Sequence, residues 1–263
     1  MTAYTSDEMM TVAAARRLTN GAVCFVGIGL PSAACNLARL THAPDLVLIY
    51  ESGTVGTRPT VLPLSIGDGE LAETARTVIP LPEIFTHYLQ RGRVDVGFLG
   101  GAQIDRFGNL NSTVIGPYDA PSVRLPGAGG APEIAMHVKE LLIVMKQSAR
   151  TFVNQLAFRT TAGFLDGGDA RARAGFPGGG PRVVITNLGE MTPDAETHEL
   201  VLSATFDGVT VDDVRVACGW PLRVAGSVTR IAPPTAAELQ TLRDLQQRTR
   251  KAHAQRVRVT LPT

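Results

Sequence analysis

Short, continuous apolar runs alternate with helical segments along the first two-thirds of this sequence. The runs lie at residues 22–26, 46–50, 94–99 and 141–146, and segments with helical periodicity separate several of them. Strands that are apolar at every position are buried on both faces, which is typical of a parallel sheet covered by helices on each side. The pattern therefore predicts an open three-layer α/β/α fold with a mostly parallel sheet.

The character of the sequence changes after Thr161. Glycine-rich stretches at residues 166–169 and 175–181 predict long loops. Thr235, with Glu238 three residues later, predicts a capping box at the start of a final helix. Because no internal repeat or flexible linker interrupts the chain, we expect one domain over residues 1–263, in which residues 162–263 form a loop-rich extension.

Charge and cysteine content narrow the class of protein. The formal net charge of the 263 residues is +1, which gives no reason to expect nucleic acid or an anionic membrane as a partner. No apolar run approaches the roughly 20 residues needed to cross a bilayer. Three widely spaced cysteines predict reduced thiols, and therefore a cytoplasmic protein. We expect no metal site, because the histidines are not grouped at ligand spacing: His42, His87, His137, His198 and His253.

One stretch resembles the start of a dinucleotide-binding domain. A predicted strand leads into Gly27-Ile28-Gly29 and a helix, and the next strand ends on Glu51, which would hold a ribose hydroxyl. The third glycine of that fingerprint falls at position 32, where Ser32 stands instead. A nicotinamide enzyme is therefore a minor alternative.

Three glycine-marked stretches follow strand-like or extended segments. They are Glu51-Ser52-Gly53, Gly100–Asn109 and Pro126–Ala131. Loops beyond the carboxyl ends of parallel strands converge on one crevice of an open sheet. A carboxylate and two sets of glycine amides are therefore expected to face one ligand.

Such a set of groups supports acyl transfer. An unpaired carboxylate in a partly dry pocket can attack a thioester carbonyl and form an anhydride. Two preorganised backbone N–H groups would stabilise the oxyanion of the tetrahedral intermediate, and glycines allow their close approach. Gly129 and Gly130 precede a predicted helix, whose dipole favours negative charge at that end.

The motifs also resemble a known family. The Glu51-Ser52-Gly53 motif, GGAQIDRFGNLN at 100–111, STVIGPY at 112–118 and RLPGAGGA at 124–131 resemble, in order, the β subunit of two-subunit class I CoA-transferases. The glutaconate and 3-oxoadipate CoA-transferases have a B-type subunit of this kind. The resemblance covers nearly the whole chain and implies the open α/β fold of that superfamily.

The resemblance implies a mechanism and a set of site residues. Glu51 is then the nucleophile of a ping-pong reaction that passes through a glutamyl-CoA thioester, and a Gly130 amide helps to form the oxyanion hole. Gly129, Gly101, Gln103, Ser52 and Gly53 are expected to contact the acyl-CoA. Coenzyme A is a substrate, and no metal or redox cofactor is expected.

The resemblance further implies a homologous α subunit, in a heterodimer or an α2β2 heterotetramer, that completes the site. The substrates are an acyl-CoA and a carboxylic acid, dicarboxylic or 3-oxo, whose distal group Arg58, Arg106, Arg124 or the partner would bind. Two alternatives stay open. One is a subunit of an acyl-CoA or ring-cleaving hydrolase, and the other is a non-catalytic binding domain on the same fold.

Overall fold

The chain forms two compact units. Unit 1 comprises Met1–Leu81 together with Pro234–Thr263, and unit 2 comprises Pro82–Pro233. The computed structural model describes residues 3–259, with side chains described as far as residue 255. The single domain expected over residues 1–263 stays a prediction. The expected boundary at residue 162 lies inside unit 2, whereas the last helix belongs to unit 1.

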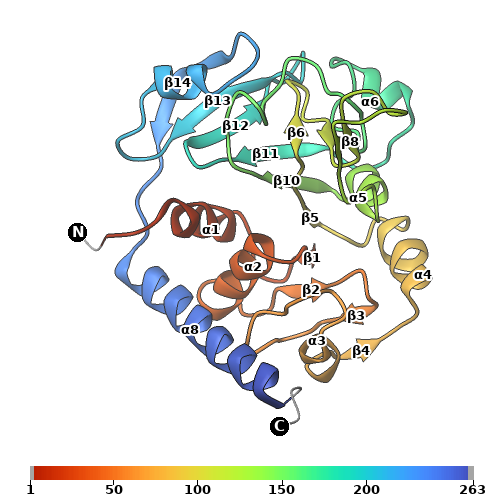
Figure 1. The fold of residues 1–263 in the computed structure, drawn as a ribbon, viewed down its shortest axis with the longest axis vertical. Coiled ribbons are helices and arrows are strands. Elements are labelled where there is room, and N and C mark those ends of the chain that lie inside the picture. The colour runs from red at the N-terminus through yellow and green to blue at the C-terminus, as the bar shows by residue number, and fades with distance from the viewer. Residues whose placement is uncertain (1–2, 260–263) are drawn as a thin grey trace. The chain divides into compact units, whose positions relative to one another are not determined.

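Unit 1 combines short strands with longer helices, as Figure 1 shows by label. Its strands are β1 (Val23–Phe25), β2 (Val47–Ile49), β3 (Thr54–Val55) and β4 (Thr77–Val78). Its helices are α1 (Ser6–Arg16), α2 (Leu30–Leu40), α3 (Gly69–Glu73) and α8 (Ala236–Val259).

The strands of unit 1 follow the order β1-β2-β3-β4. β1 and β2 are parallel, with Cys24 opposite Leu48, and both side chains are fully buried. β3 and β4 continue the sheet in antiparallel pairings. The parallel pair is the part that the continuous apolar runs predict, and it places the carboxyl ends of β1 and β2 at the same edge.

The first and last helices of the described chain contact each other in unit 1, where α8 packs against α1 and α2 (Figure 1). Arg16 of α1 binds both carboxylate oxygens of Glu238 in α8, at 2.8 and 2.7 Å. The capping box expected at Thr235 and Glu238 is confirmed. The sequence also predicts a first helix through Leu18 with Ser6 or Asp7 as its cap. That cap is wrong: Thr5 forms the capping box with Glu8, because the helix begins at Ser6.

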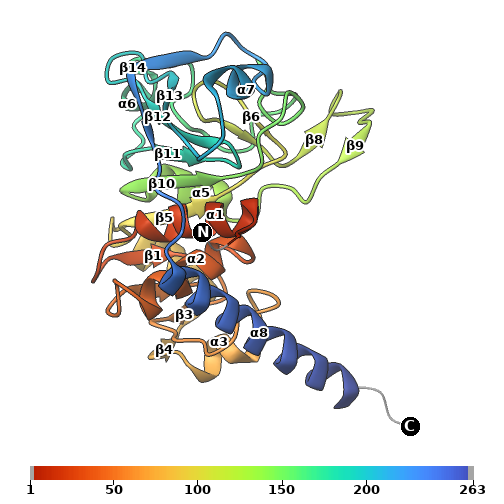
Figure 2. The same cartoon turned by 90° about the vertical axis from the view of Figure 1, so that its left-hand side faces the viewer.

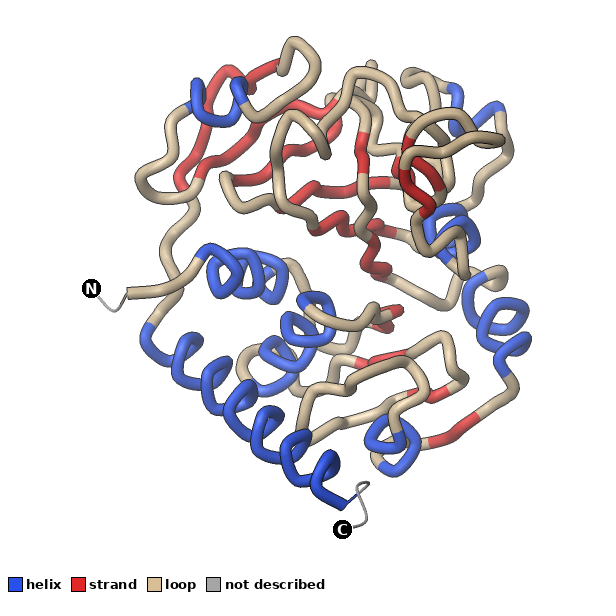
Figure 3. Tube along the Cα trace, in the orientation of Figure 1, coloured by secondary structure: helices blue, strands red, loops and turns tan. Residues whose placement is uncertain are grey.

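Unit 2 contains most of the strands and loops of the chain (Figure 3). Its strands are β5 (Val96–Leu99), β6 (Gln103–Ile104), β7 (Leu110–Asn111), β8 (Val114–Ile115), β9 (Val123–Arg124), β10 (Glu140–Val144), β11 (Pro181–Ile185), β12 (Gly189–Pro193), β13 (Leu200–Thr205) and β14 (Arg223–Arg230). Its helices are η1 (Ile84–Leu89), α5 (Ala131–His137), α6 (Ala170–Arg173) and α7 (Val211–Val216), and α4 (Leu81–Glu83) leads into η1.

The main sheet of unit 2 follows the order β14-β13-β12-β11-β10-β5. β10 is parallel to both β5 and β11, whereas β12 is antiparallel to β11 and β13. Two short hairpins, β6-β7 and β8-β9, stand apart from this sheet. Figure 2 shows the β8-β9 hairpin extending away from the rest of unit 2.

One predicted helix differs in its winding. The sequence predicts a compact α-helix over residues 82–90 that ends at Gly92, and Gly92 does end the turn with a positive φ of 64°. Residues 84–89 instead form a π-helix, in which the Gln90 N–H donates to the Phe85 carbonyl five residues earlier. Only Ile84 and Leu89 of its apolar residues are fully buried, so the wider winding leaves Phe85 and Tyr88 partly exposed.

Candidate active site

Glu51 lies in a tight turn at the carboxyl end of β2. The Tyr50 N–H donates to the Thr54 carbonyl at 3.1 Å, and the Gly53 N–H donates to the Tyr50 carbonyl at 3.0 Å. The buried strand fixes the start of this turn, and Glu51, its first residue beyond Tyr50, is half-buried. The sequence prediction of a carboxylate at a strand end is thus matched by the local structure.

Gly53 lets the turn pack against the backbone of Ile79, the residue after β4. Its φ is +103°, and a Cβ added there would lie 2.0 Å from the Ile79 carbonyl oxygen. The Gly53 carbonyl in turn accepts a hydrogen bond of 3.0 Å from the Ile79 N–H. Gly53 is therefore required by packing, whatever contact it makes with a ligand.

The neighbouring strand sends a second loop from the same edge of unit 1. The Val26 N–H, just after β1, donates to the Ile49 carbonyl at 2.9 Å, which aligns the two strand ends. Gly27-Ile28-Gly29 follows, and Gly29 begins α2 with a φ of 83° and no side-chain cap. The Glu51 turn and the α2 start are thus adjacent features of one sheet edge.

The first glycine segment of unit 2 packs against β7. A Cβ on Gly101 would lie 3.1 Å from the Asn111 carbonyl oxygen, and the Ala102 N–H donates to that same oxygen at 2.8 Å. Gln103 uses its side-chain oxygen inside the fold, where it accepts hydrogen bonds from Asn111 Nδ2 at 2.8 Å and from the Ala157 N–H at 3.2 Å. Of the polar side-chain atoms of Gln103, the nitrogen is therefore the one left to contact a ligand.

The second glycine segment is held by Ser112, the residue after β7. The Gly127 N–H donates to the Ser112 carbonyl, and Ser112 Oγ donates to the Gly127 carbonyl, both at 2.8 Å. Gly129 has a φ of 49°, and Gly130 begins α5. Within the described part of the chain, no group accepts a hydrogen bond from the N–H of Gly129 or Gly130. These two amides are therefore available as donors.

Asn111 and Ser112 thus bring the two glycine segments of unit 2 together. Asn111 is fully buried, its Nδ2 donates to the Val114 carbonyl at 2.7 Å, and its Oδ1 accepts from the Thr113 N–H at 3.0 Å. From the sequence, Asn111 is expected to shape a turn or to contact the substrate through its side chain, and Ser112 has no predicted role. The link of Ser112 to Gly127 is a contact between distant positions, which the spacing of the motifs does not reveal.

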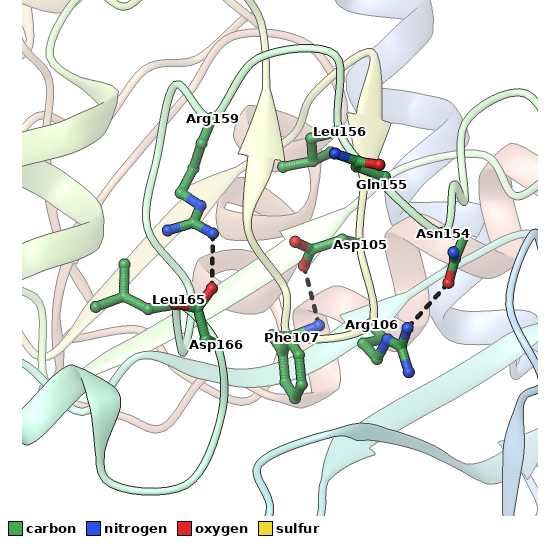
Figure 4. Close-up of a pocket in the computed structure, with 9 residues that line it drawn as sticks. All are labelled: Asp105, Arg106, Phe107, Asn154, Gln155, Leu156, Arg159, Leu165 and Asp166. Carbon is green, nitrogen blue, oxygen red and sulfur yellow. Dashed lines mark hydrogen bonds and ion pairs between the residues drawn. The ribbon is translucent and has the colours of Figure 1, made fainter.

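A cavity of unit 2 lies on the turn that joins β6 to β7 (Figure 4). It measures about 430 Å³, and its lining includes Asp105, Arg106, Phe107, Asn154 and Arg159. Burial raises the pKa of Asp105, although hydrogen bonds from Asn109 and the Phe107 N–H oppose this shift. The cavity lies at the opposite end of the β6-β7 hairpin from Gly101 and Asn111, and Asp105, Arg106 and Phe107 of the glycine-marked stretch 100–109 line it.

The three arginines considered for a substrate carboxylate lie in different surroundings. Arg106 donates to Asn154 Oδ1 at 3.0 Å beside the cavity, and the Arg124 guanidinium lies 5.1 Å from the ring centroid of Tyr118. Arg58 of unit 1 donates to the Pro44 carbonyl at 3.1 Å. Arg106 and Arg124 thus belong to separate hairpins of unit 2 and have different partners.

Metal-binding and membrane-crossing features are both missing from the described residues. None of their groups of His, Cys, Asp and Glu side chains is arranged to hold a metal ion. None of the helices described between residues 3 and 259 has the length and apolar character that a bilayer crossing requires.

Comparison with known proteins identifies the family. The family model for coenzyme A transferases matches residues 7–217. The B-type subunit of 3-oxoadipate CoA-transferase from Pseudomonas knackmussii is 62% identical over 255 residues, which cover 97% of this chain and 98% of that protein. The chain therefore belongs to the coenzyme A transferase family, as the sequence motifs predicted.

A solved relative confirms the fold. The B-type subunit of glutaconate CoA-transferase from Acidaminococcus fermentans is 36% identical over 240 residues, covering 89% of this chain and 90% of that protein. The crystal structure of glutaconate coenzyme A-transferase from that organism matches with a TM-score of 0.86 and 34% identity, over 92% of this chain and 94% of the other. The expected open α/β fold is confirmed.

A relative of lower sequence identity is named as a hydrolase, not as a transferase. The cholesterol ring-cleaving hydrolase IpdB subunit of Mycobacterium tuberculosis is 26% identical over 242 residues, covering 91% of this chain and 93% of that protein. The relatives of this chain therefore include proteins named as hydrolases as well as proteins named as transferases.

Proposed function

We propose that this chain is the B-type subunit of a heteromeric CoA-transferase, which moves coenzyme A from an acyl-CoA to a dicarboxylic or 3-oxo carboxylic acid. The observation that carries the proposal is Glu51, which stands at the end of β2 in a chain 62% identical to the corresponding subunit of a 3-oxoadipate CoA-transferase. A carboxylate at this place is the group that such a transfer requires.

Glu51 acts as the nucleophile. One of its carboxylate oxygens attacks the carbonyl carbon of the acyl-CoA, and collapse of the tetrahedral intermediate breaks the C–S bond and releases the CoA thiolate. The thiolate then attacks the Glu51 carbonyl of the mixed anhydride and displaces the donor carboxylate. The glutamyl-CoA thioester that remains is attacked by the acceptor carboxylate, and the same steps run in reverse.

The backbone amides of unit 2 stabilise the charge that develops. The N–H of Gly130, with Gly129 beside it, supplies donors to the oxyanion, an effect worth several kcal/mol in comparable sites. Gly101 and the side-chain nitrogen of Gln103 contact the acyl-CoA, and Ser52 and Gly53 flank the reacting carboxylate. This chemistry uses carboxylates and amides and calls for no metal or redox cofactor, with coenzyme A as a substrate.

A homologous α subunit completes the site, in a heterodimer or an α2β2 heterotetramer. Support comes from the relatives at 62% and 36% identity, since each is named as one subunit of a larger enzyme. The isolated chain is expected to show no transfer activity. A cytoplasmic location belongs to the same proposal, and the sulfur atoms of Cys24 and Cys35, 3.6 Å apart as free thiols, are in keeping with a reducing compartment.

A trapping experiment tests the proposal. The chain is co-expressed with an α-type partner subunit, mixed with an acyl-CoA and treated with borohydride, which reduces a glutamyl thioester to an alcohol. Peptide mass spectrometry is expected to place the change on Glu51, and an equal reaction without acyl-CoA serves as the control. An active complex that leaves Glu51 unmodified would defeat the proposal.

A hydrolase is the second candidate, because a relative at 26% identity is named as a ring-cleaving hydrolase. The two activities differ in their need for an acceptor. A transferase consumes acyl-CoA only when an acceptor acid is supplied, whereas a hydrolase consumes it in buffer alone. A non-catalytic domain would consume none under either condition with an intact partner.

A further inference from the structure

Tyr50, the residue before Glu51, is held by hydrogen bonds in three directions. Its N–H and its carbonyl close the turn around Glu51, through Thr54 and Gly53. Its hydroxyl lies 3.0 Å from Ser32 Oγ, in the first turn of α2. Tyr50 is fully buried and Ser32 is 1% exposed, so each hydroxyl depends on the other for a partner away from water.

The contact continues into α2 and beyond it. Asn36, also fully buried, donates from Nδ2 to the Ser32 carbonyl at 2.9 Å. Arg39 donates to Asn36 Oδ1 at 3.1 Å and to the Pro59 carbonyl at 2.8 Å. A connected set of polar groups therefore runs from the Glu51 turn through one face of α2 to the segment after β3.

The Tyr50 hydroxyl takes no part in proton transfer. Burial raises the pKa of this phenol well above its ordinary value, although the Ser32 hydrogen bond lowers it in part. The phenol therefore stays protonated across the working pH range. Its contribution is the direction in which the turn presents Glu51, and that direction matters because misplacing a reacting group by about 1 Å can cost roughly a hundredfold in rate.

We infer that Tyr50 and Ser32 are positioning residues for the nucleophile: their hydroxyl pair fixes the Glu51 turn against α2 while the carboxylate passes through anhydride and thioester. The inference rests on the proposed function of Glu51. Neither residue touches the substrate. The pair acts by holding the backbone still while the Glu51 side chain changes its covalent partner.

The test uses Tyr50→Phe and Ser32→Ala in the complex with the α-type partner. Each variant removes one hydroxyl and keeps most of the packing volume. We expect kcat to fall about tenfold or more in each, with the KM for acyl-CoA changed less than about twofold. The double variant is expected to fall no further than the worse single variant, because both changes break the same contact.

The matched control is Thr57→Val. Thr57 is fully buried in unit 1, and its hydroxyl lies 2.7 Å from that of Thr74 at the far end of β3 from the Glu51 turn. Loss of this pair lowers the temperature of unfolding as loss of the Tyr50 pair does, but kcat is expected to stay unchanged. The rate of Glu51 trapping by borohydride in a single turnover gives a second readout.

The outcomes separate the two hypotheses. Unmodified Glu51 in the wild-type complex overturns the proposed function. Normal trapping in the wild type with an unchanged kcat in Tyr50→Phe overturns the positioning role alone. Equal losses of kcat in Tyr50→Phe and Thr57→Val also overturn it, since they show a general effect of lower stability. Additive losses of kcat in the double variant overturn it as well, since they show that the two hydroxyls act independently.

Discussion

The two units hold their proposed site residues in place by different means. In unit 1, Glu51 is the second residue after the strand β2, and backbone hydrogen bonds of the turn that follows this strand fix its place. In unit 2, the Gly129 and Gly130 amides lie on an irregular loop, which Ser112 holds at Gly127 through one side-chain and one backbone hydrogen bond. A side-chain nucleophile needs only a strand end, whereas free backbone donors need a segment released from secondary structure and held by other groups.

The largest effect is expected from Glu51 itself. Glu51→Gln replaces the anionic carboxylate by a neutral amide, so transfer should fall to background, and Glu51→Asp should lose on the order of a hundredfold because the carboxylate retracts. Steady-state kcat with the partner subunit measures both. An unchanged temperature of unfolding is the control, since Glu51 is only half-buried. Substantial transfer activity of Glu51→Gln would show that Glu51 of unit 1 is not the nucleophile.

Gly53→Ala tests the backbone packing of the unit 1 turn. The added Cβ would lie 2.0 Å from the Ile79 carbonyl oxygen at a φ of +103°, so the turn or the neighbouring strand must move. We expect the free energy of unfolding to fall by about 3 kcal/mol or more, measured by urea titration. Gly21→Ala is the control, since its φ of 79° is similar but no atom lies within 4 Å of the added carbon. Equal losses in the two variants would show that the conformation alone, not the contact with Ile79, sets the cost.

Asn111→Ala tests the corresponding support in unit 2. It leaves the Val114 carbonyl and the side-chain oxygen of Gln103 without a fully buried donor, and we expect a loss of about 2–3 kcal/mol in the free energy of unfolding. Asn154→Ala is the matched control, because this exposed asparagine accepts its hydrogen bond from Arg106 at the surface. A small loss of stability in Asn111→Ala would show that the glycine segments keep their structure without the Asn111 hydrogen bonds.

The smallest effect concerns the contact between α1 and α8. Burial tends to raise the pKa of Glu238, but hydrogen bonds from Arg16 and Thr235 outweigh it and lower the pKa from 4.5 to about 2. A folded-state pKa below the unfolded value adds stability above pH 4.5, and that stability is lost as the pH falls towards 2.

Acid titration of unfolding checks this expectation. The wild type should exceed Glu238→Gln in stability by about 1 kcal/mol at about pH 6, since a partly exposed pair is screened by solvent. The gap should narrow steadily between pH 4.5 and pH 2. A constant gap over that range would show that the carboxylate charge is not the source of the stability.

Much of the framework of the fold could be predicted from the sequence. The apolar runs correspond to β1, β2, β5 and β10 within one or two residues at each end, and Cys24 and Cys35 are buried as expected. Hydrophobic periodicity and helix capping reflect the local conformational preferences of the chain, and these preferences determine where the buried strands and helices form. The Glu51 motif was found for the same reason, because it follows one of these strands directly.

Other features depend on contacts that local patterns do not reveal. β14 is not predicted, because most of its residues are exposed and its sequence lacks an apolar run. Nor does the sequence point to Arg171, which is 5% exposed and donates to the carbonyls of Ala135, Gly163 and Gly178. Burial of this guanidinium lowers its pKa to about 10. Its partners are backbone atoms brought near only by the complete fold.

The meeting of α1 and α8 has a consequence for how the protein is made. Unit 1 takes its first helix from the start of the described chain and its last from residues 236–259, with all of unit 2 in between. A ribosome therefore delivers the whole of unit 2 before the helix that joins Arg16 and Arg243 to their carboxylates exists. The unit that carries Glu51 is begun first and finished last, so a chain released early would lack the ion pairs that join α1 to α8.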